Sequence, residues 1–273
     1  MGKAIYQPSG KASEYSKWAV NFYNGCSAKC EYCYNRHGIT AKILGADIPT
    51  LKKCLKNEDT AIEIFKKELF QNLPELQKHG LFFNFVSDPF LPETVGLNTW
   101  CMRECLKVDV PIKILTKQTW WIDEFIQEIN INGTIWNKDV NIARKLMAFG
   151  FTLTAHDEKE YGTAPNMDRI GAMIVLNEEG FKTWASIEPI IEFDSSLEMI
   201  RKTIGYCDLY KIGIQSGKHY DKSFLIAFMN MVSRITGGKI PLYFKDSLLK
   251  MAGIERSKLP INCVVSDYNI FKS

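Results

Sequence analysis

Short apolar segments alternate with longer amphipathic segments along most of this chain, and no other feature constrains its fold as strongly. The longer segments carry apolar residues at helical spacing, as at Ile62, Phe65 and Leu69. Strands separated by helices pair in parallel through right-handed crossovers, so the alternation predicts an α/β fold with a buried parallel sheet. The expected strands cover residues 18–24, 81–86, 111–115, 151–154, 183–187, 209–214 and 240–244.

The number of strand–helix units narrows the architecture. Six or seven units are too few for a regular eight-unit barrel, so we expect a partial (β/α)6 barrel of the TIM type with parallel strands. A doubly wound open sheet is the alternative, and either fold places active-site residues at the carboxyl ends of the strands. No composition shift marks a linker. We therefore expect one domain over residues 1–273, with a core at about 18–246 and a C-terminal extension at 247–273.

Local signals predict two helix boundaries. Asp59 or Thr60 is the expected N-cap of a helix over residues 60–73, because both side chains can accept a hydrogen bond from a backbone N–H group. Gly150 follows a helical pattern over residues 138–149, at a position where glycine commonly ends a helix. We therefore expect that helix to end at Gly150 and the next strand to follow directly.

Composition excludes several classes of protein. The net charge of +3 is too small to indicate nucleic-acid binding by itself. There is no run of 18 apolar residues, and the first residues lack the apolar segment of a secretory signal. We therefore expect a cytoplasmic protein without a membrane partner, in which the eight cysteines are reduced.

Three cysteines lie close together directly after the first expected strand. Cys26, Cys30 and Cys33 have the spacing C-x3-C-x2-C. Thiolates on one tight loop can hold a soft metal centre, such as an iron–sulfur cluster, zinc or Cu(I). A closed zinc site needs four ligands, for which His37 is the available fourth. The residues therefore leave two interpretations: a cluster with one open iron, or a non-catalytic zinc-binding interaction module.

The cysteine spacing resembles the signature of the radical S-adenosylmethionine (SAM) superfamily, with Tyr32 as the aromatic residue before the last cysteine. The resemblance implies a [4Fe–4S] cluster on Cys26, Cys30 and Cys33, whose open iron chelates SAM. One electron then cleaves the sulfonium to a 5′-deoxyadenosyl radical, which takes a hydrogen atom from a substrate. The resemblance also implies an electron donor such as flavodoxin or ferredoxin.

Segments at other expected strand ends, within residues 84–93, 114–117, 186–189 and 243–246, resemble the spore-photoproduct-lyase-like branch and its phage-associated relatives. This branch, often called DNA repair photolyase, suggests nucleic acid as the substrate. Its lyases use a hydrogen-donating cysteine just before the hydroxyl residue that follows the second strand. Val86 occupies that position here, so we do not predict the photoproduct-lyase reaction.

The resemblance assigns cofactor-binding roles to residues at the expected strand ends and in the cysteine loop. A hydroxyl and a carboxylate after the second strand are expected to bind the SAM amino group, a lysine after the third its carboxylate, and a threonine after the fourth its ribose. These residues, with Tyr32 and a glutamate for SAM or substrate, are Tyr32, Ser87, Asp88, Lys117, Thr154 and Glu188. Gln215 and Lys245 are expected to face the substrate, and no catalytic residue is assigned.

Overall fold

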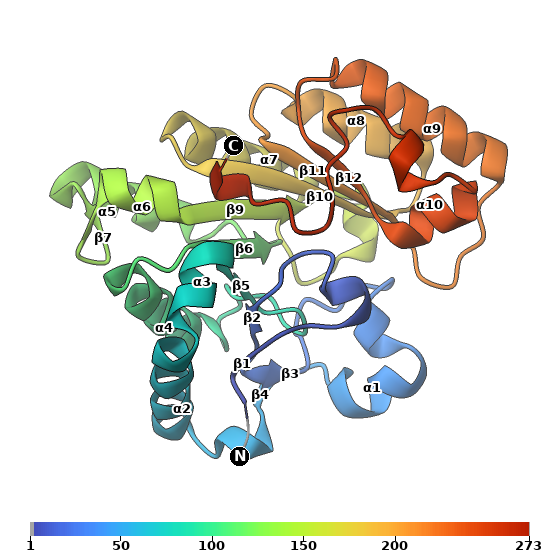
Figure 1. Cartoon of the computed structure of the whole chain (residues 1–273). Helices are drawn as coiled ribbons and strands as arrows, with labels where there is room; N and C mark the ends of the chain where they lie inside the picture. Colours follow the sequence, from blue (N-terminus) through green and yellow to red (C-terminus); the bar gives the residue numbers. More distant parts are fainter. Residues whose placement is uncertain (1–2, 273) are drawn as a thin grey trace.

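The computed structural model describes residues 3–272, apart from the side chains of residues 39 and 40. Its central sheet has eight strands in the order β1-β2-β5-β6-β9-β10-β11-β12 (Figure 1). From β2 to β12 all neighbouring strands are parallel, whereas β1 pairs antiparallel with β2. The strands are β1 (Ile5–Tyr6), β2 (Ala19–Val20), β5 (Leu81–Phe83), β6 (Ile112–Thr116), β9 (Met147–Thr152), β10 (Lys182–Ile190), β11 (Leu209–Ile214) and β12 (Leu242–Phe244).

The strand order identifies the sheet as part of a barrel. A doubly wound sheet reverses its order at a switch point. Here the strands follow the chain in one direction from β2 to β12, so right-handed crossovers place their helices on one face. The edge strands β1 and β12 are not neighbours, which leaves the barrel open. The predicted partial barrel is therefore confirmed, and the doubly wound alternative is wrong.

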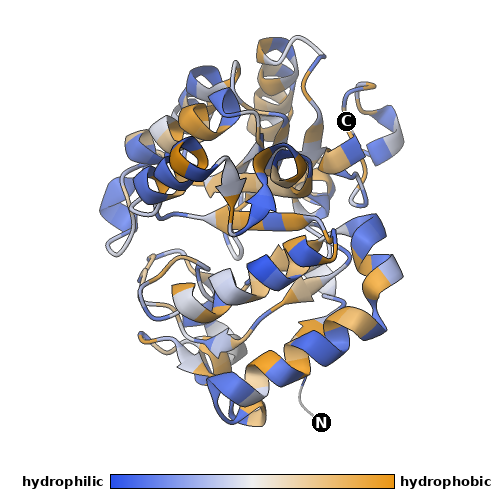
Figure 2. Cartoon of the chain, turned by 90° about the vertical axis from the view of Figure 1, so that its left-hand side faces the viewer, coloured by the Kyte–Doolittle hydropathy of each residue, from blue (hydrophilic) through white to orange (hydrophobic). Residues whose placement is uncertain are grey.

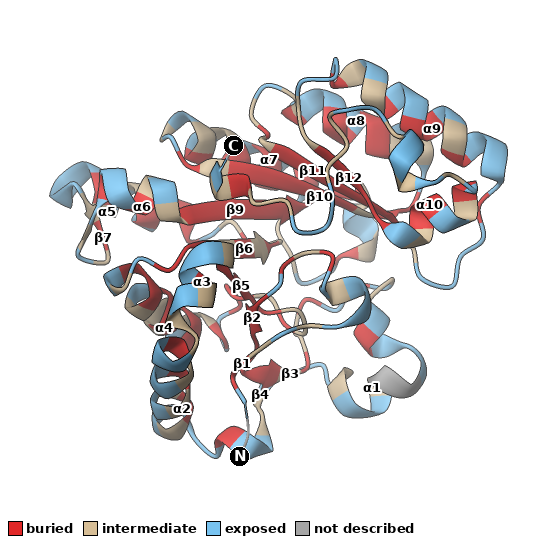
Figure 3. Cartoon of the chain, viewed as in Figure 1, coloured by how far each residue is buried: buried red, intermediate tan, exposed pale blue. Residues whose placement is uncertain are grey.

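Helices cover the outer face of this sheet. Apolar side chains on their inner faces, such as Phe65 of α2 and Phe125 of α5, join the main core. The strands are almost entirely buried, whereas the helices have exposed outer faces (Figure 3) with more hydrophilic residues (Figure 2). None of the helices within residues 3–272 is long and apolar enough to cross a bilayer. The helices around the sheet are α2 (Glu58–Gln71), α3 (Leu73–His79), α4 (Val95–Lys107), α5 (Ile122–Asn132), α6 (Val140–Leu146), α7 (Asn166–Glu178), α8 (Phe193–Thr203), α9 (Lys222–Ile235) and α10 (Asp246–Ala252).

Smaller elements lie outside this frame. The short ribbon of β3 and β4 and helix α1 flank the cysteine loop, and a second ribbon, β7 and β8, follows α5 (Figure 1). A separate apolar cluster on the inner face of the sheet includes Phe82, Trp184 and Ile270, and Tyr15 packs against it. Both terminal segments therefore contribute to the filling of the barrel. The smaller elements are β3 (Tyr23–Asn24), β4 (Thr50–Leu51), α1 (Gly38–Leu44), β7 (Thr134–Ile135) and β8 (Lys138–Asp139).

Two predicted boundaries are wrong. Gly150 lies inside β9 and not at a helix end, because α6 ends at Leu146. A Cβ atom on Gly150 would lie 2.1 Å from Cε2 of Trp184, so the missing side chain makes room for the indole ring. Helix α2 is capped by Asn57, whose side chain accepts a hydrogen bond from the backbone N of Thr60 at 2.8 Å. The helix therefore begins at Glu58, and neither Asp59 nor Thr60 is its cap.

Candidate functional site

A cavity of about 570 Å³ lies at the carboxyl ends of the parallel strands. Residues from the cysteine loop, from the N-terminal segment and from the ends of β5, β6, β9, β10, β11 and β12 line it. The structure therefore brings together residues that are far apart in the sequence. The predicted site residues that line the cavity are Cys26, Cys30, Tyr32, Cys33, Ser87, Asp88, Lys117, Glu188, Gln215 and Lys245.

The cysteine loop follows β3 and turns sharply twice. Gly25 has φ +85°, and a Cβ atom there would lie 2.6 Å from the carbonyl oxygen of Ile48. Lys29 also has a positive φ, of 51°. The backbone N of Cys33 donates to the carbonyl oxygen of Cys30 at 3.2 Å, which closes the second half of the loop. These turns are what allow three thiols on one short loop to face the same cavity.

The donor set fits a cluster better than a single zinc ion. Within residues 3–272, no three His, Cys, Asp or Glu side chains are placed to hold one metal ion. The ring nitrogen Nε2 of His37 lies 3.1 Å from the backbone oxygen of Glu31. A [4Fe–4S] cluster binds each thiolate through a different iron, so its three ligands need not converge on one point. The geometry therefore does not favour the zinc site built on the three cysteines and His37.

Burial favours the protonated thiols of Cys26 and Cys33 when no metal is bound. It raises the pKa of Cys26 to about 11, and it also raises the pKa of the Cys33 thiol. Metals bind the thiolate and not the thiol, so metal binding at this loop must release protons.

One wall of the cavity carries buried polar groups without partners. Asn84, directly after β5, is 4% exposed, and neither its amide nitrogen nor its amide oxygen has a hydrogen-bond partner among the described residues. The hydroxyl of Ser87 and the side-chain oxygen of Asn35 are also buried and have no hydrogen-bond partner within residues 3–272. Leaving such a group unsatisfied costs about 1–3 kcal/mol, so this wall is suited to a polar ligand. Asn35 and Asn84 were not predicted, and the position of Asn84 at a strand end was the only signal.

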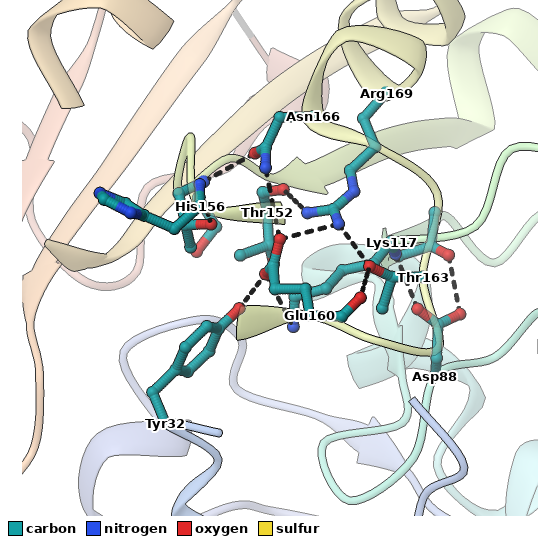
Figure 4. Close-up of polar contacts among 12 residues, drawn as sticks. Tyr32, Asp88, Lys117, Thr152, His156, Glu160, Thr163, Asn166 and Arg169 are labelled. Carbon is teal, nitrogen blue, oxygen red and sulfur yellow. Dashed lines mark hydrogen bonds and ion pairs between the residues drawn. The ribbon is translucent and has the colours of Figure 1, made fainter. Parts of the chain in front are cut away.

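Asp88 connects two strand ends. One carboxylate oxygen accepts from the hydroxyl of Thr116 at 2.7 Å and from the backbone N of Phe90 at 3.0 Å. The other accepts from the backbone N of Lys117 at 2.7 Å (Figure 4). Burial raises the pKa of Asp88, while these hydrogen bonds oppose the shift. Both oxygens are therefore engaged within the protein, and Asp88 holds the end of β6 against the segment that follows β5.

Lys117 extends toward the cysteine loop. Its ammonium group lies 5.4 Å from the ring centre of Tyr32 and 4.0 Å from a carboxylate oxygen of Glu160. Burial favours the neutral amine, but Cys30, Tyr32 and Glu160 together raise the pKa of Lys117 well above its usual range. The cavity therefore contains a lysine that stays charged beside the cysteines.

The residue predicted to bind ribose does not reach the cavity. Thr154 is fully buried and does not line it, because the chain leaves β9 at Thr152 and turns away. The backbone N of Thr154 donates to the side-chain oxygen of Asn166 at 2.8 Å, and its hydroxyl accepts from the backbone N of His156 at 3.3 Å. Thr152 lines the cavity in its place. The sequence prediction ended this strand at Thr154, two residues beyond its end at Thr152.

An ion pair lines the side of the cavity formed by β10 and β12. The ammonium group of Lys245 lies 2.9 and 3.1 Å from the two carboxylate oxygens of Glu188. The hydroxyl of Tyr15, which was not predicted, donates to Glu188 at 2.6 Å. A Cβ atom on Gly213 would lie 2.8 Å from both side chains of the pair, so this glycine leaves room for them. The cavity therefore has a second polar region, formed by strands that are far from the cysteine loop in sequence.

Comparison with known proteins supports the fold. No family model and no curated protein matches the chain. Among solved structures, a spore photoproduct lyase mutant with bound AdoMet and dinucleoside spore photoproduct is 15% identical, with a TM-score of 0.51 over 85% of this chain and 64% of the lyase. Streptococcus suis SuiB bound to its precursor peptide SuiA is 13% identical, with a TM-score of 0.56 over 89% of this chain and 52% of SuiB. A further mutant of spore photoproduct lyase is 14% identical, with a TM-score of 0.55 over 88% of this chain and 78% of the lyase.

These identities are low, so the likeness concerns the fold. Both proteins are radical SAM enzymes, and this chain has their partial barrel. It spans about two thirds of the lyase in the first comparison and about half of SuiB.

Proposed function

We propose that this chain is a radical SAM enzyme with a [4Fe–4S] cluster on Cys26, Cys30 and Cys33. The observation that carries the proposal is the shared cavity, in which the three cysteines face a wall of buried, unpartnered polar groups. The fold supports it, because radical SAM enzymes have the same partial barrel. When bound, the cluster supplies one electron that breaks the C5′–S bond of SAM, giving methionine and a 5′-deoxyadenosyl radical that takes a hydrogen atom from the substrate.

The polar wall suits the two charged groups of the methionine end of SAM. The side-chain oxygens of Asn35 and Asn84 can accept hydrogen bonds from an ammonium group. The amide nitrogen of Asn84, the hydroxyl of Ser87 and the ammonium group of Lys117 can donate to a carboxylate. Asp88 holds Lys117 in place through its backbone. Asp88 therefore acts on the SAM site indirectly, by positioning Lys117, and not through the direct contact with SAM that the sequence predicted.

The remaining predicted residues divide between cofactor and substrate. Thr152 takes the role expected of Thr154 and faces the ribose, and Tyr32 lies beside the cofactor. Glu188 and Lys245 face the substrate, because they line the part of the cavity formed by β10 and β12 and not the part formed by the cysteine loop. Their donor and acceptor atoms already satisfy each other, so a substrate group must exchange bonds with an existing pair.

The substrate and the electron donor are proposed as classes of molecule. The lyase structure contains a dinucleoside photoproduct and the SuiB structure a peptide, so the shared fold accepts both kinds of molecule. The resemblance to the lyase branch favours nucleic acid. Val86 lines the cavity where lyases carry a cysteine, and photoproduct cleavage is not proposed. We further propose a reductant such as flavodoxin or ferredoxin, a cytoplasmic location and a single domain over residues 1–273.

The test begins with anaerobic reconstitution using iron and sulfide. Wild-type protein should bind about four irons and, once reduced, convert SAM to 5′-deoxyadenosine. Cys30→Ala should lose both the cluster and the product. Cys54→Ala is the matched control, because Cys54 is exposed and lies outside the cavity. Iron retained in Cys30→Ala, or a wild-type protein that binds stoichiometric zinc and no iron, contradicts the proposal.

A second variant tests the polar wall. Asn84 has φ +59°, which glycine adopts freely, so Asn84→Gly removes the amide without straining the backbone. Loss of hydrogen bonds to a charged group should weaken SAM binding by about tenfold or more. The melting temperature of the metal-free protein should fall only slightly, through the greater backbone freedom of glycine in the unfolded chain. The amide itself has no hydrogen-bond partner among the described residues, so its removal breaks no bond. Unchanged SAM affinity in equilibrium dialysis would remove Asn84 from the site.

A further inference from the structure

The segment between β9 and α7 folds over the cysteine loop. We name residues 155–164 the clasp segment. The backbone N of Glu31 donates to the carbonyl oxygen of Lys159 at 2.9 Å, and the backbone N of Gly162 donates to that of Ala28 at 2.9 Å. The carboxylate of Glu31 also lies 3.2 Å from the Lys159 ammonium group and accepts from the Tyr161 hydroxyl at 2.7 Å. The clasp segment thus contacts the loop on both sides of Cys30.

A buried ion pair anchors the clasp segment to the barrel. Glu160 and Arg169 of α7 have fully buried side chains, and they approach to 2.8 Å. Arg169 also donates to the carbonyl oxygen of Thr152 at 2.8 Å and to the hydroxyl of Thr163 at 2.6 Å (Figure 4). Asn166 donates to Glu160 at 3.4 Å. The carboxylate of Glu160 is therefore held from the end of β9 and from the first turns of α7.

The same carboxylate reaches the cysteine loop. The hydroxyl of Tyr32 donates to Oε1 of Glu160, and the ammonium group of Lys117 lies 4.0 Å from that oxygen (Figure 4). Tyr32 is the residue between Cys30 and Cys33 whose ring also faces Lys117. The Glu160 carboxylate thus joins the aromatic ring of the loop and the cavity lysine through one oxygen, and the frame of the barrel, by way of Arg169, through the other.

We propose that Glu160 is a positioning residue, which sets the place of Tyr32 and Lys117 and thereby the shape of the cysteine loop. This inference rests on the proposed function, since the loop it positions is the proposed cluster loop. The structural argument is one of charge. A buried carboxylate is stable only with partners, and Glu160 has Arg169, Tyr32 and Lys117 around it. Removing its charge leaves the buried Arg169 and the partly buried Lys117 without this anion, and the phenol without a charged acceptor.

Hydrogen exchange of the reduced, metal-free protein tests the inference without cluster or SAM. Glu160→Gln removes the charge, whereas Tyr32→Phe removes only the phenolic hydroxyl group and keeps the Glu160–Arg169 pair. Amides in residues 25–36 should exchange about tenfold faster or more in both variants, as expected for loss of a charge-assisted hydrogen bond. The double variant should match Glu160→Gln, because both changes break the same link. The control is Glu158→Gln, since Glu158 is exposed in the same segment.

A further variant, tested beside its own control, separates the clasp segment from the cysteine loop without changing any charge. A Cβ atom on Gly162 would lie 2.5 Å from the carbonyl oxygen of Ser27, so Gly162→Ala should push the loop away and speed its exchange. Gly171→Ala is the control, because nothing lies within 4 Å of a Cβ atom there. The inference is overturned if residues 25–36 exchange at the wild-type rate in Glu160→Gln, Tyr32→Phe and Gly162→Ala. It is also overturned if the effects of Glu160→Gln and Tyr32→Phe on the exchange rate are strictly additive in the double variant.

The reduction potential of the reconstituted cluster separates positioning from a purely structural role. Net charge near an iron–sulfur cluster influences its potential. Glu160→Gln leaves Lys117 and Arg169 uncompensated, so the potential should become more positive, and Glu158→Gln should not change it. An unchanged potential in Glu160→Gln overturns the inference. If no cluster assembles in the wild-type protein, the proposed function fails, and the exchange experiment still decides whether Glu160 positions the loop.

Discussion

Replacing Lys245 by methionine tests the ion pair at the substrate side of the cavity. The Lys245 side chain is 2% exposed, and its ammonium group lies 2.9 Å from Glu188 and 3.5 Å from Glu14. Methionine has a similar length but no charge, so the variant leaves two carboxylates facing each other around an apolar chain. Removing one partner of a buried ion pair costs about 3–5 kcal/mol. Tyr15 and Tyr243 still donate to the two carboxylates, so we expect the lower end of this range, about 3 kcal/mol.

The assay is thermal unfolding of the reduced, metal-free protein. A loss of this size should lower the melting temperature by about 6–12 °C in a domain of this length. Glu188→Gln/Lys245→Met should recover part of the loss, because it also removes one of the facing carboxylates. Lys250→Met in α10 is the control, since Lys250 is exposed and should change stability by no more than about 0.5 kcal/mol. A melting temperature for Lys245→Met equal to that of the control would refute the electrostatic reasoning.

The other two predictions concern the inside of the barrel. Gly150→Ala places a Cβ atom 2.1 Å from the buried ring of Trp184, so overpacking should cost about 1–3 kcal/mol and lower the melting temperature, whereas an unchanged value contradicts the packing argument. Burial lowers the pKa of Lys113 to about 8, and the unfolded chain titrates near 10.4, so stability should rise with pH between these two values. The free energy of unfolding of Lys113→Met, measured by chemical denaturation, should therefore exceed that of wild type by most below pH ~8 and by least near pH ~10. An equal difference at both pH values contradicts the reasoning.

Local patterns in the sequence were sufficient for the repeating fold and the cysteine loop. The alternation of apolar and amphipathic segments predicts parallel pairing because each strand and its crossover helix are neighbours in the chain. Cys26, Cys30 and Cys33 are recognised for the same reason, since their spacing lies within one short turn. Lys117 and Glu188 could be placed at the cavity because both lie near the carboxyl end of an apolar strand.

Residues that depend on strand boundaries were harder to predict. Gly150 was assigned to a helix end, although it is the inward-facing position of β9 opposite Trp184. This error shifted the strand and led to Thr154 instead of Thr152. A glycine gives the same sequence signal whether it ends a helix or makes room for a ring, and only the packing of the neighbouring strand distinguishes the two.

The chain's sequence alone determines that strands and helices alternate and that three thiols share one turn, because these properties arise between residues a few positions apart. The tertiary structure decided which polar groups surround that turn. Glu160 meets Tyr32 across 128 positions, and Tyr15 meets Glu188 across 173. Such contacts have no local signature, since the sequence does not distinguish a buried glutamate from an exposed one. Their partners are specified only when the closing of the barrel brings distant strand ends around one cavity.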